Sequence, residues 1–404
     1  MDFNDTATEA AFRAEARAWL DANRPDNWQA LIAQSAAETN EAGRAWQAKK
    51  ADAGWTFLGW PKEYGGRGVS AIEQAIWDEE EGELARLTDF MVIGRGMAGP
   101  TLLRYGNEEQ KRALLPDLVR GNKVWCQLFS EPGAGSDLAG IRTRSVRDGS
   151  DWVINGQKIW TSYAHLADFG ILVTRSDPSV PKHKGLTYFY VDMHSPGMEV
   201  KPIKQISGDA EFNEVYLDNV RIPDKQRLGE VGDGWNVALA TLMSERTSIG
   251  SIFRSDYDDM HAYLKDQFVD GVPALQHPAV RERLADFYVD GAGMRNLNLR
   301  TMSALSKGRR PGPEGSIGKL VMARQRQNEA SFILDMQNYA GIISDENLGE
   351  AQGAFQYRFF RTVANRIEGG TDEILANIIA ERVLGLPSEP RLDKDLPFTD
   401  IPTS

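Results

Sequence analysis

The chain has 404 residues, a length typical of two or three domains rather than of one compact core. Its hydrophobic fraction of 41% and charged fraction of 26% are ordinary for a folded globular protein, which argues against a fibrous or disordered chain. The formal net charge is −12, and no run of Lys or Arg with interleaved aromatic residues occurs, which argues against a nucleic-acid partner.

The few cysteines and histidines limit the chemistry further. Cys126 is the single cysteine, so the chain forms no internal disulfide, as is usual in a reducing cytoplasm. The five histidines are scattered, and none has metal-ligand spacing to a second His or Cys, so no metal site is expected. The first residues have no basic segment, and no later stretch is apolar over the length of a bilayer span. We therefore expect a cytoplasmic protein without membrane insertion.

The first stretch, residues 1–122, has a helical period. Thr6 and Glu9 have the spacing of a capping box, and so do Asn107 and Gln110, which open a segment that ends at Gly121. Apolar residues fall on one face behind the first box: Phe12, Ala16, Trp19 and Leu20. Behind the second box they are Leu114, Leu115 and Leu118, with Pro116 among them. An N-terminal α-helical domain is predicted.

The second stretch, residues 123–226, consists of short β-branched and aromatic runs between turn residues. Asn155-Gly156 predicts a tight hairpin between residues 152–154 and 158–160, because both central residues tolerate positive φ. Further strands are expected at residues 171–173, 186–191 and 215–217. This pattern is typical of a β-barrel or sandwich.

The third stretch, residues 227–404, returns to the helical period. Four residues spaced at i, i+3, i+4 and i+7 fall on one helix face: Leu239, Leu242, Met243 and Arg246. Other helices are expected over residues 317–340 and 371–383, the latter ending at Gly385. The fold class is therefore an α+β multidomain protein, with a helical domain, a middle β domain and a C-terminal helical bundle.

Two segments carry residues suited to ligand binding. Residues 129–137, F-S-E-P-G-A-G-S-D, place small residues after a strand, where backbone can approach a ligand closely. A bare G-x-G is more often an ordinary turn. Residues 157–162, Q-K-I-W-T-S, place a Trp beside two hydroxyls, which could cover a planar ring and bond to its edge. Taken alone, this Trp is more often a core residue.

Together the two motifs make the chain resemble the acyl-CoA dehydrogenase family. Further landmarks occur in the expected order: W-P-K-E-Y-G-G at 60–66, Y-G-N-E-E-Q at 105–110 and G-T-D-E-I at 370–374. The resemblance spans almost the whole chain, and its motifs are specific as a set. It implies an N-terminal α, middle β and C-terminal α architecture and an FAD cofactor.

The resemblance also implies positions for the FAD site. The residues expected near the isoalloxazine are Gln127, Phe129, Ser130, Gly135, Ser136, Trp160, Thr161 and Ser162. Those expected near the adenine half, often across a subunit interface, are Gln337, Gly341, Thr371 and Glu373. Ser136 and Arg246 are the expected substrate contacts. Independently of the family, Thr371 has the character of a helix N-cap, which by itself requires no ligand.

The catalytic base is expected at one of two positions. Many relatives place a glutamate in I-Y-E-G-T, but residues 367–371 here are I-E-G-G-T, so Gly369 stands at that position. A smaller subgroup, which includes isovaleryl- and long-chain-type enzymes, places it on a C-terminal-domain helix before an arginine, as Glu245 and Arg246 do here. Glu245 is therefore the expected base, and Glu368 the alternative. Without the family, Glu245 would more often be a surface glutamate in an ion pair.

The implied reaction converts an acyl-CoA to its trans-2-enoyl-CoA, as in β-oxidation and lipid catabolism. Glu245 would take the α-proton while the β-hydride goes to flavin N5, and the backbone N–H of Gly369 would hydrogen-bond the thioester carbonyl. The glycine at 369 suggests a wide cavity and a branched, long or polycyclic substrate. An electron-transferring flavoprotein or a similar acceptor is the expected redox partner.

The quaternary structure and two other activities stay open. The Arg-x-x-Phe-Gly stretch of the family has no counterpart between Arg254 and His277, so a homodimer, a homotetramer and an α2β2 assembly are all compatible with the sequence. One alternative function is a non-catalytic partner subunit of a heteromeric dehydrogenase. Another is a flavin oxidase or monooxygenase on the same fold, since fold does not determine the electron acceptor.

Overall fold

The computed structural model describes residues 5–32, 36–250, 257–305, 312–313, 315–345, 347–391 and 393–402, except the side chains of 36–38, 246–250, 302 and 305. The chain forms two compact units. The first comprises Met1–Lys204, Ala210–Glu245 and Glu389–Ser404, and the second comprises Gln205–Asp209 and Arg246–Ser388.

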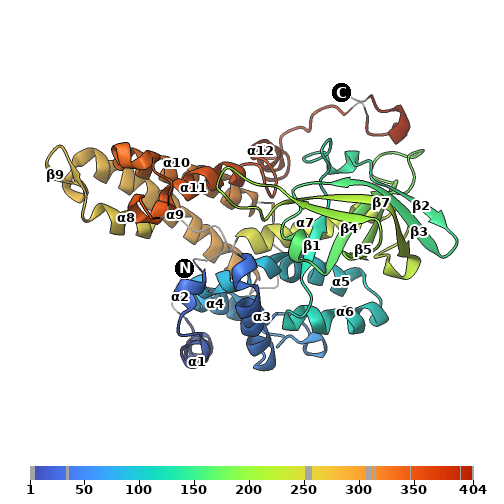
Figure 1. The fold of residues 1–404 in the computed structure, drawn as a ribbon, viewed down its shortest axis with the longest axis horizontal. Helices are drawn as coiled ribbons and strands as arrows, with labels where there is room; N and C mark the ends of the chain where they lie inside the picture. Colours follow the sequence, from blue (N-terminus) through green and yellow to red (C-terminus); the bar gives the residue numbers. More distant parts are fainter. Residues whose placement is uncertain are drawn as a thin grey trace. The chain divides into compact units, whose positions relative to one another are not determined.

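The first unit begins with a group of helices (Figure 1). They are α1 Ala7–Asn23, α2 Trp28–Ile32, α3 Ala36–Asp52, α4 Ala71–Glu81, α5 Gly99–Tyr105 and α6 Glu108–Arg120. Both predicted capping boxes are present, at Thr6 with Glu9 and at Asn107 with Gln110. Helix α6 continues through Pro116 and ends at Gly121, whose φ of 76° is left-handed.

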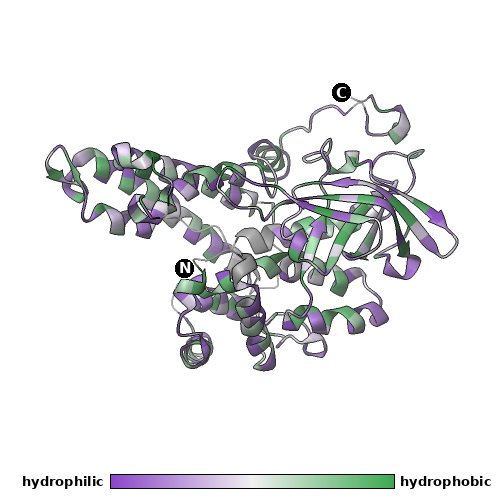
Figure 2. Cartoon of the chain, viewed as in Figure 1, coloured by the Kyte–Doolittle hydropathy of each residue, from purple (hydrophilic) through white to green (hydrophobic). Residues whose placement is uncertain are grey.

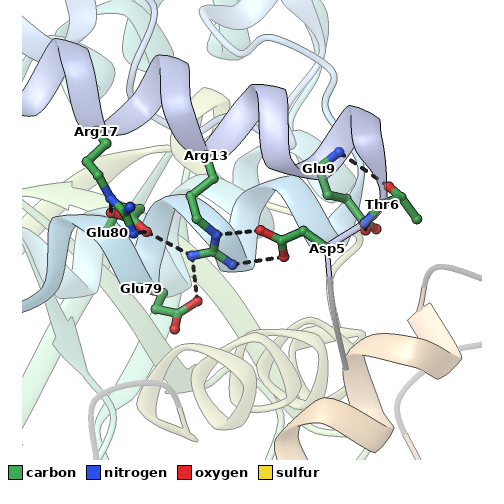
Figure 3. A network of polar contacts seen from close by, with 7 residues as sticks. All are labelled: Asp5, Thr6, Glu9, Arg13, Arg17, Glu79 and Glu80. Carbon is green, nitrogen blue, oxygen red and sulfur yellow. Dashed lines mark hydrogen bonds and ion pairs between the residues drawn. The ribbon is translucent and has the colours of Figure 1, made fainter. Parts of the chain in front are cut away.

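Helices α1 and α4 are joined by charged side chains (Figure 3). Arg13 of α1 contacts Glu79 and Glu80 of α4 as well as Asp5, and Arg17 also pairs with Glu80. Beneath these contacts lies an aromatic core. Its members include Phe12, Trp46, Trp55 and Trp77, and the rings of Trp55 and Trp77 are stacked with centroids 4.6 Å apart. The apolar face predicted for α1 is therefore buried.

A seven-stranded sheet follows in the same unit (Figure 1). Its strands are β1 Trp125–Leu128, β2 Arg144–Asp148, β3 Asp151–Lys158, β4 Phe169–Arg175, β5 Leu186–Asp192, β6 Met198–Pro202 and β7 Asn213–Pro223. The order is β1-β4-β2-β3-β7-β6, with β5 paired to β4. Strands β1 and β4 are parallel, whereas the β2/β3, β3/β7, β4/β5 and β6/β7 pairs are antiparallel. The predicted middle β domain is confirmed.

The hairpin predicted at Asn155-Gly156 is wrong. Strand β3 continues through both residues, and the actual hairpin turn is Gly149-Ser150, between β2 and β3. Asn155 lies where the β3/β7 register shifts, and its side chain accepts a hydrogen bond from the N–H of Asn219. A Cβ at Gly156 would lie 2.3 Å from the Thr143 hydroxyl, so this glycine permits close packing rather than a turn.

The sheet and the N-terminal helices share one hydrophobic core. Buried residues of the strands include Leu172, Phe189 and Val215, and Phe90 and Met91 from the N-terminal helical segment pack among them. The helical part and the β part of the first unit are therefore packed as one body.

The second unit is mainly helical, which confirms the predicted C-terminal bundle. Its helices are α8 Tyr257–Leu264, α9 Pro278–Leu305, α10 Gly315–Met336, α11 Ala354–Asn365 and α12 Asp372–Ile378. Its two short strands are β8 Phe268–Val269 and β9 Val272–Pro273. Helix α10 contacts α9, α11 and α12. Helix α7, Gly234–Gly250, crosses the boundary between the units, since Glu245 is the last residue of its part in the first unit.

Hydrophobic and hydrophilic residues alternate along helices and strands of both units (Figure 2). Among the described residues, none of the helices combines the length and the apolar character needed to cross a membrane.

Candidate active site

The first unit brings together three of the predicted segments. They are strand β1, the glycine-serine loop that follows it (residues 129–137), and residues 159–162 at the end of β3. The N–H of Ile159 donates to the carbonyl of Ser130 at 2.9 Å, which fixes the start of the loop beside the end of β3. The Phe129 ring packs edge-on against Tyr188 of β5, with centroids 5.8 Å apart.

A buried ion pair anchors the glycine-serine loop. The ammonium of Lys158, which is 0% exposed, donates to Glu131 at 2.8 Å and to the carbonyl of Phe129 at 3.0 Å. Glu131 also accepts from the N–H groups of Arg142 and Thr143. Burial raises the pKa of Glu131, but the charge and hydrogen bond of Lys158 outweigh burial and hold this pKa below its usual range. Glu131 is therefore held as a carboxylate.

The tip of the loop is a tight turn. Glu131 and Ala134 exchange both backbone hydrogen bonds, each at 3.0 Å. Gly133 within this turn is exposed, and so are Gly135 and Ser136 beyond it. A Cβ built on Gly133 or Gly135 would meet nothing within 4 Å, so internal packing does not require glycine at these positions. The small residues leave backbone accessible to a ligand.

Residues 160–162 combine an exposed aromatic ring, that of Trp160, with a buried hydroxyl group, that of Thr161. Trp160 has a left-handed backbone, φ 58°, and its side chain is 56% exposed. Thr161 is buried, and its N–H donates to the carbonyl of Asn213 at 3.0 Å. The Thr161 hydroxyl is buried and finds no hydrogen-bond partner in the described part of the chain. Ser162 is half-buried.

Glu245 of α7 contacts the site from a neighbouring element. Its carboxylate accepts a hydrogen bond of 3.2 Å from the side-chain amide of Gln127 on β1. Both side chains are half-buried. Burial raises the pKa of the nearby Tyr188, and the negative charge of Glu245 raises it further. Arg246, the predicted substrate contact, has its side chain outside the described residues.

The predicted residues of the second unit lie in two groups. Residues 369–373 form a turn and the start of α12, where Gly369 has a φ of 63° and the Thr371 hydroxyl accepts from the N–H of Ile374 at 3.2 Å. The predicted N-cap is confirmed. Glu373 is exposed in the first turn. Within the described ranges, the N–H of Gly369 donates to no group of the chain.

Gln337 and Gly341 form the other group, after α10. The side chain of Gln337 is buried and accepts a hydrogen bond of 2.9 Å from Gln356 of α11. The same Gln356 amide donates to the carbonyl of Gly341 at 3.3 Å. A Cβ at Gly341 would lie 2.7 Å from the carbonyl oxygen of Leu334, so the local backbone alone accounts for this glycine.

Glu368, the alternative base, is occupied by other groups. Arg361 donates to both of its carboxylate oxygens, at 3.2 and 3.0 Å, and the amide of Asn365 also donates to it. This bidentate geometry is typical of a structural ion pair.

The residues present fit a flavin. The Thr161 hydroxyl and the Oε1 atom of Gln127 are buried polar atoms without partners among the described residues, and such atoms ordinarily have one. The exposed Trp160 ring lies next to Thr161 in the chain and is suited to cover a planar ring system.

Reasoning from the sequence missed Lys158 and Glu131 as the anchor of the loop. A signal was present: Trp152, Ile154 and Lys158 alternate with period two, which places Lys158 on the buried face of β3.

Three family models match the chain in succession. "Acyl-CoA dehydrogenase, N-terminal domain" matches residues 6–122, the middle domain of the same family matches residues 126–220, and its C-terminal domain matches residues 232–384.

Relatives of known name agree with these models. The chain is 37% identical over 387 residues to acyl-CoA dehydrogenase IpdE1 of Mycobacterium tuberculosis (strain ATCC 25618 / H37Rv), covering 94% of this chain and 98% of that protein. It is 39% identical over 343 residues to acyl-CoA dehydrogenase FadE34 of the same organism, covering 84% of this chain. That match spans 46% of FadE34, less than half of its length.

Among solved structures, the one titled "Tcur3481-Tcur3483 steroid ACAD" is similar with a TM-score of 0.82 and 31% identity. The match covers 96% of this chain and all of that chain.

Proposed function

Because the chain belongs to the acyl-CoA dehydrogenase family and is therefore an oxidoreductase with FAD as cofactor, we propose that it dehydrogenates a bulky acyl-CoA with Glu245 as base. One observation carries this proposal: the carboxylate of Glu245 is hydrogen-bonded to Gln127, two residues before Phe129 and the glycine-serine loop. Helix α7 thus presents a carboxylate to the strand that leads into the predicted flavin loop.

The proposed reaction removes two hydrogens from the thioester. The Cα–H bond breaks and its proton passes to the carboxylate of Glu245, while the Cβ–H bond breaks with its electron pair and a Cα–Cβ double bond forms. Bound FAD supplies the acceptor for that hydride. The Gln127 amide holds one carboxylate oxygen of the half-buried Glu245 in place, and a general base must be positioned in this way to take a proton.

The backbone N–H of Gly369 is proposed to stabilise negative charge on the thioester oxygen. Its freedom from hydrogen bonds within the described chain supports this role, because a donor already in use could not serve. A preorganised donor of this kind typically contributes about 3 kcal/mol to the transition state.

Glu368 is not the proposed base, since its carboxylate is held by Arg361 and Asn365. A carboxylate that accepts from a guanidinium at both oxygens is fixed in direction. Proton abstraction by Glu368 would require that ion pair to break.

The residues proposed to hold FAD are those predicted from the sequence. Ser130, Thr161 and Ser162 would supply hydroxyls and Trp160 would cover the ring, with Gln127, Phe129, Gly135 and Ser136 beside them. In the second unit, the residues proposed for the adenine half are Gln337, Gly341, Thr371 and Glu373. Ser136 and Arg246 are the proposed substrate contacts.

A cyclic or polycyclic acyl group is the proposed substrate class. Gly369 provides no side chain where many relatives have a glutamate, and two kinds of relative carry names of this type. One is the steroid ACAD, and the other is cyclohexane-1-carbonyl-CoA dehydrogenase of Geobacter metallireducens, 30% identical to this chain over 343 residues.

A heteromeric assembly is also proposed. Two similar structures are named as pairs, Tcur3481-Tcur3483 and the ChsE4-ChsE5 complex. In the second unit, Tyr339 and Ile342 are large apolar residues with exposures of 91% and 84%, a composition typical of a protein interface. Co-purification with a related chain would support this assembly, and a purely self-associated enzyme with full activity would contradict it.

The experiment that tests the function is an anaerobic titration of FAD-loaded protein with butyryl-CoA, cyclohexane-1-carbonyl-CoA and steroid-derived CoA thioesters. Bleaching of the flavin band by the cyclic thioesters, with at most slow bleaching by butyryl-CoA, is expected. Equal bleaching by all three would contradict the substrate class. Protein that stays colourless on addition of FAD would favour a non-catalytic subunit, and rapid reoxidation by oxygen with peroxide formation would favour an oxidase.

A further inference from the structure

The last residues of the chain form a strap on the β part of the first unit. The N–H of Phe398 donates to the carbonyl of Val180 at 3.0 Å, and the N–H of Thr399 donates to that of Pro178 at 3.1 Å. Pro397 forms an isolated β-bridge with Pro181. We call residues 393–399 the C-terminal strap. It lies along the loop between β4 and β5.

An aromatic ring of the strap packs on a buried arginine. The guanidinium carbon of Arg175 lies 3.6 Å from the ring centroid of Phe398, and that of Arg142 lies 5.4 Å from it. Arg175 donates to the carbonyls of Ile141, at 3.1 Å, and of Ala139. Phe398 therefore covers the side chain that holds the segment directly after the glycine-serine loop.

A lysine links the strap to the loop itself. Lys182 pairs with Asp393 of the strap at 2.8 Å and with Asp137 at 3.0 Å. The Lys182 side chain is mostly buried. Asp137 is the last residue of the glycine-serine loop and follows Ser136, so one ammonium joins the strap to the end of the loop.

The loop depends on its ends for its shape. Lys158 holds its beginning through Glu131, and Lys182 and Arg175 hold its end. Between these points, Gly133 and Gly135 have no neighbours that would contact a side chain. Ala134 between them is buried, so the exposed positions on either side of it are held by Ala134 and by the anchors at the two ends of the loop.

We propose that the C-terminal strap is a positioning element for this loop, in which Lys182 and Phe398 hold residues 133–137 in the conformation that receives FAD and the CoA thioester. The identity of the ligands, FAD and the CoA thioester, rests on the proposed function. The contact between the C-terminal strap and the loop does not. Lys182 and Phe398 are positioning residues, since neither is placed in contact with the reacting atoms.

The test compares Phe398→Ala and Asp393→Asn with the control Lys394→Gln, an exposed neighbour that forms no ion pair within the described chain. Hydrogen exchange of the amides of residues 133–140 should accelerate about tenfold in Phe398→Ala and less in Asp393→Asn. The dissociation constants of FAD and of free coenzyme A should rise about five- to tenfold, with kcat changed less than about twofold. The control should match wild type.

Exchanging the two charges of the Lys182–Asp393 ion pair tests the docking of the strap and the positioning of the loop separately. Asp393→Lys should release the strap, and Lys182→Glu combined with Asp393→Lys should dock it again. The double variant places a carboxylate at position 182 against Asp137, so protection of the strap should return while affinity for coenzyme A stays low. Unchanged exchange in residues 133–140 of Phe398→Ala and Asp393→Lys would overturn the proposal, and so would altered exchange with unaltered affinities. Wild-type protein that binds neither FAD nor coenzyme A would refute the proposed function instead. The hydrogen-exchange rates of residues 133–140 would still show whether the strap positions the loop.

Discussion

Two segments predicted to reach the cofactor or substrate are each held by ion pairs, but in different environments. In the first unit, the glycine-serine loop depends on Lys158 and Glu131, whose side chains are 0% and 8% exposed. In the second unit, the turn before α12 is held by Arg361 with Glu368, which are 25% and 29% exposed, and by Asp372 with two arginines.

The difference indicates how much each anchor contributes. A buried charge that loses its partner cannot recover its hydration, so removing one member costs far more than the pair contributes in total. A partly exposed pair exchanges its partner for water at small cost. The loop of the first unit should therefore be sensitive to substitution of either member of its ion pair, and the second unit should tolerate loss of the partly exposed Arg361–Glu368 pair.

The largest effect is expected for Lys158→Met. The substitution leaves Glu131 buried without a counter-charge, and unfolding experiments in urea should show a loss of about 3–5 kcal/mol. FAD affinity should fall as well. The double variant Lys158→Met with Glu131→Gln removes both charges and should recover part of the loss. A single variant as stable as wild type would show that the pair is not an anchor.

A smaller effect is expected for Asp372→Asn. Asp372 is buried and accepts hydrogen bonds from Arg324 and Arg366, at 3.0 and 2.8 Å. The substitution removes the negative charge that pairs with two guanidinium groups and leaves a single, neutral acceptor oxygen, which should cost about 2 kcal/mol. Thermal unfolding of the wild type and the variant measures this loss of stability. Glu373→Gln, at an exposed residue of the same turn, is the control. Equal losses in both variants would contradict a specific role for Asp372.

A still smaller loss of stability is expected when the pH is lowered. Lys158 lowers the pKa of Glu131 despite burial, and Arg366 and Arg324 do the same for Asp372. A carboxyl with a lowered folded-state pKa contributes stability that is present above its unfolded value and lost as pH falls through the folded value. The melting temperature should therefore hold down to about pH 4.5 and fall below it. In Glu131→Gln the acid-induced fall should be shallower, and an identical fall would exclude Glu131 as its source.

The smallest effect is expected for Glu368→Gln. Its pair with Arg361 is partly exposed, so stability should fall by about 1 kcal/mol or less. The variant should also keep near wild-type kcat, because Glu368 is not the proposed base. Stopped-flow reduction of the flavin measures this directly. A loss of reduction rate by orders of magnitude would transfer the role of base to Glu368.

The sequence was a good guide where local rules act alone. Thr6, Asn107 and Thr371 each cap a helix as predicted, because an N-cap needs only neighbouring residues. Asn155-Gly156 misled because β7 pairs along the whole of β3, and pairing over that distance is invisible in a local motif. The actual hairpin turn, Gly149-Ser150, was not predicted from the sequence.

The candidate site was predictable as a set of motifs but not as a set of contacts. The resemblance indicated Glu245 and the glycine-serine loop. The partner of Glu245, Gln127, lies 118 residues away in the chain, and the anchor of the loop end comes from Lys182 and the C-terminal strap. Contacts between distant segments depend on how the elements pack, and no spacing rule within one segment reveals them.

The central claim is that Glu245 takes the α-proton, and one measurement tests it most directly. Glu245→Gln keeps the size of the side chain and one oxygen that can accept from Gln127, but removes its basicity. FAD-loaded wild type and variant are mixed anaerobically with the best thioester of the panel, and bleaching of the flavin band is followed in a stopped-flow instrument. We expect bleaching to slow by at least about a thousandfold with FAD affinity unchanged, in the range of lost general-base catalysis. A variant that bleaches as fast as wild type would contradict the account.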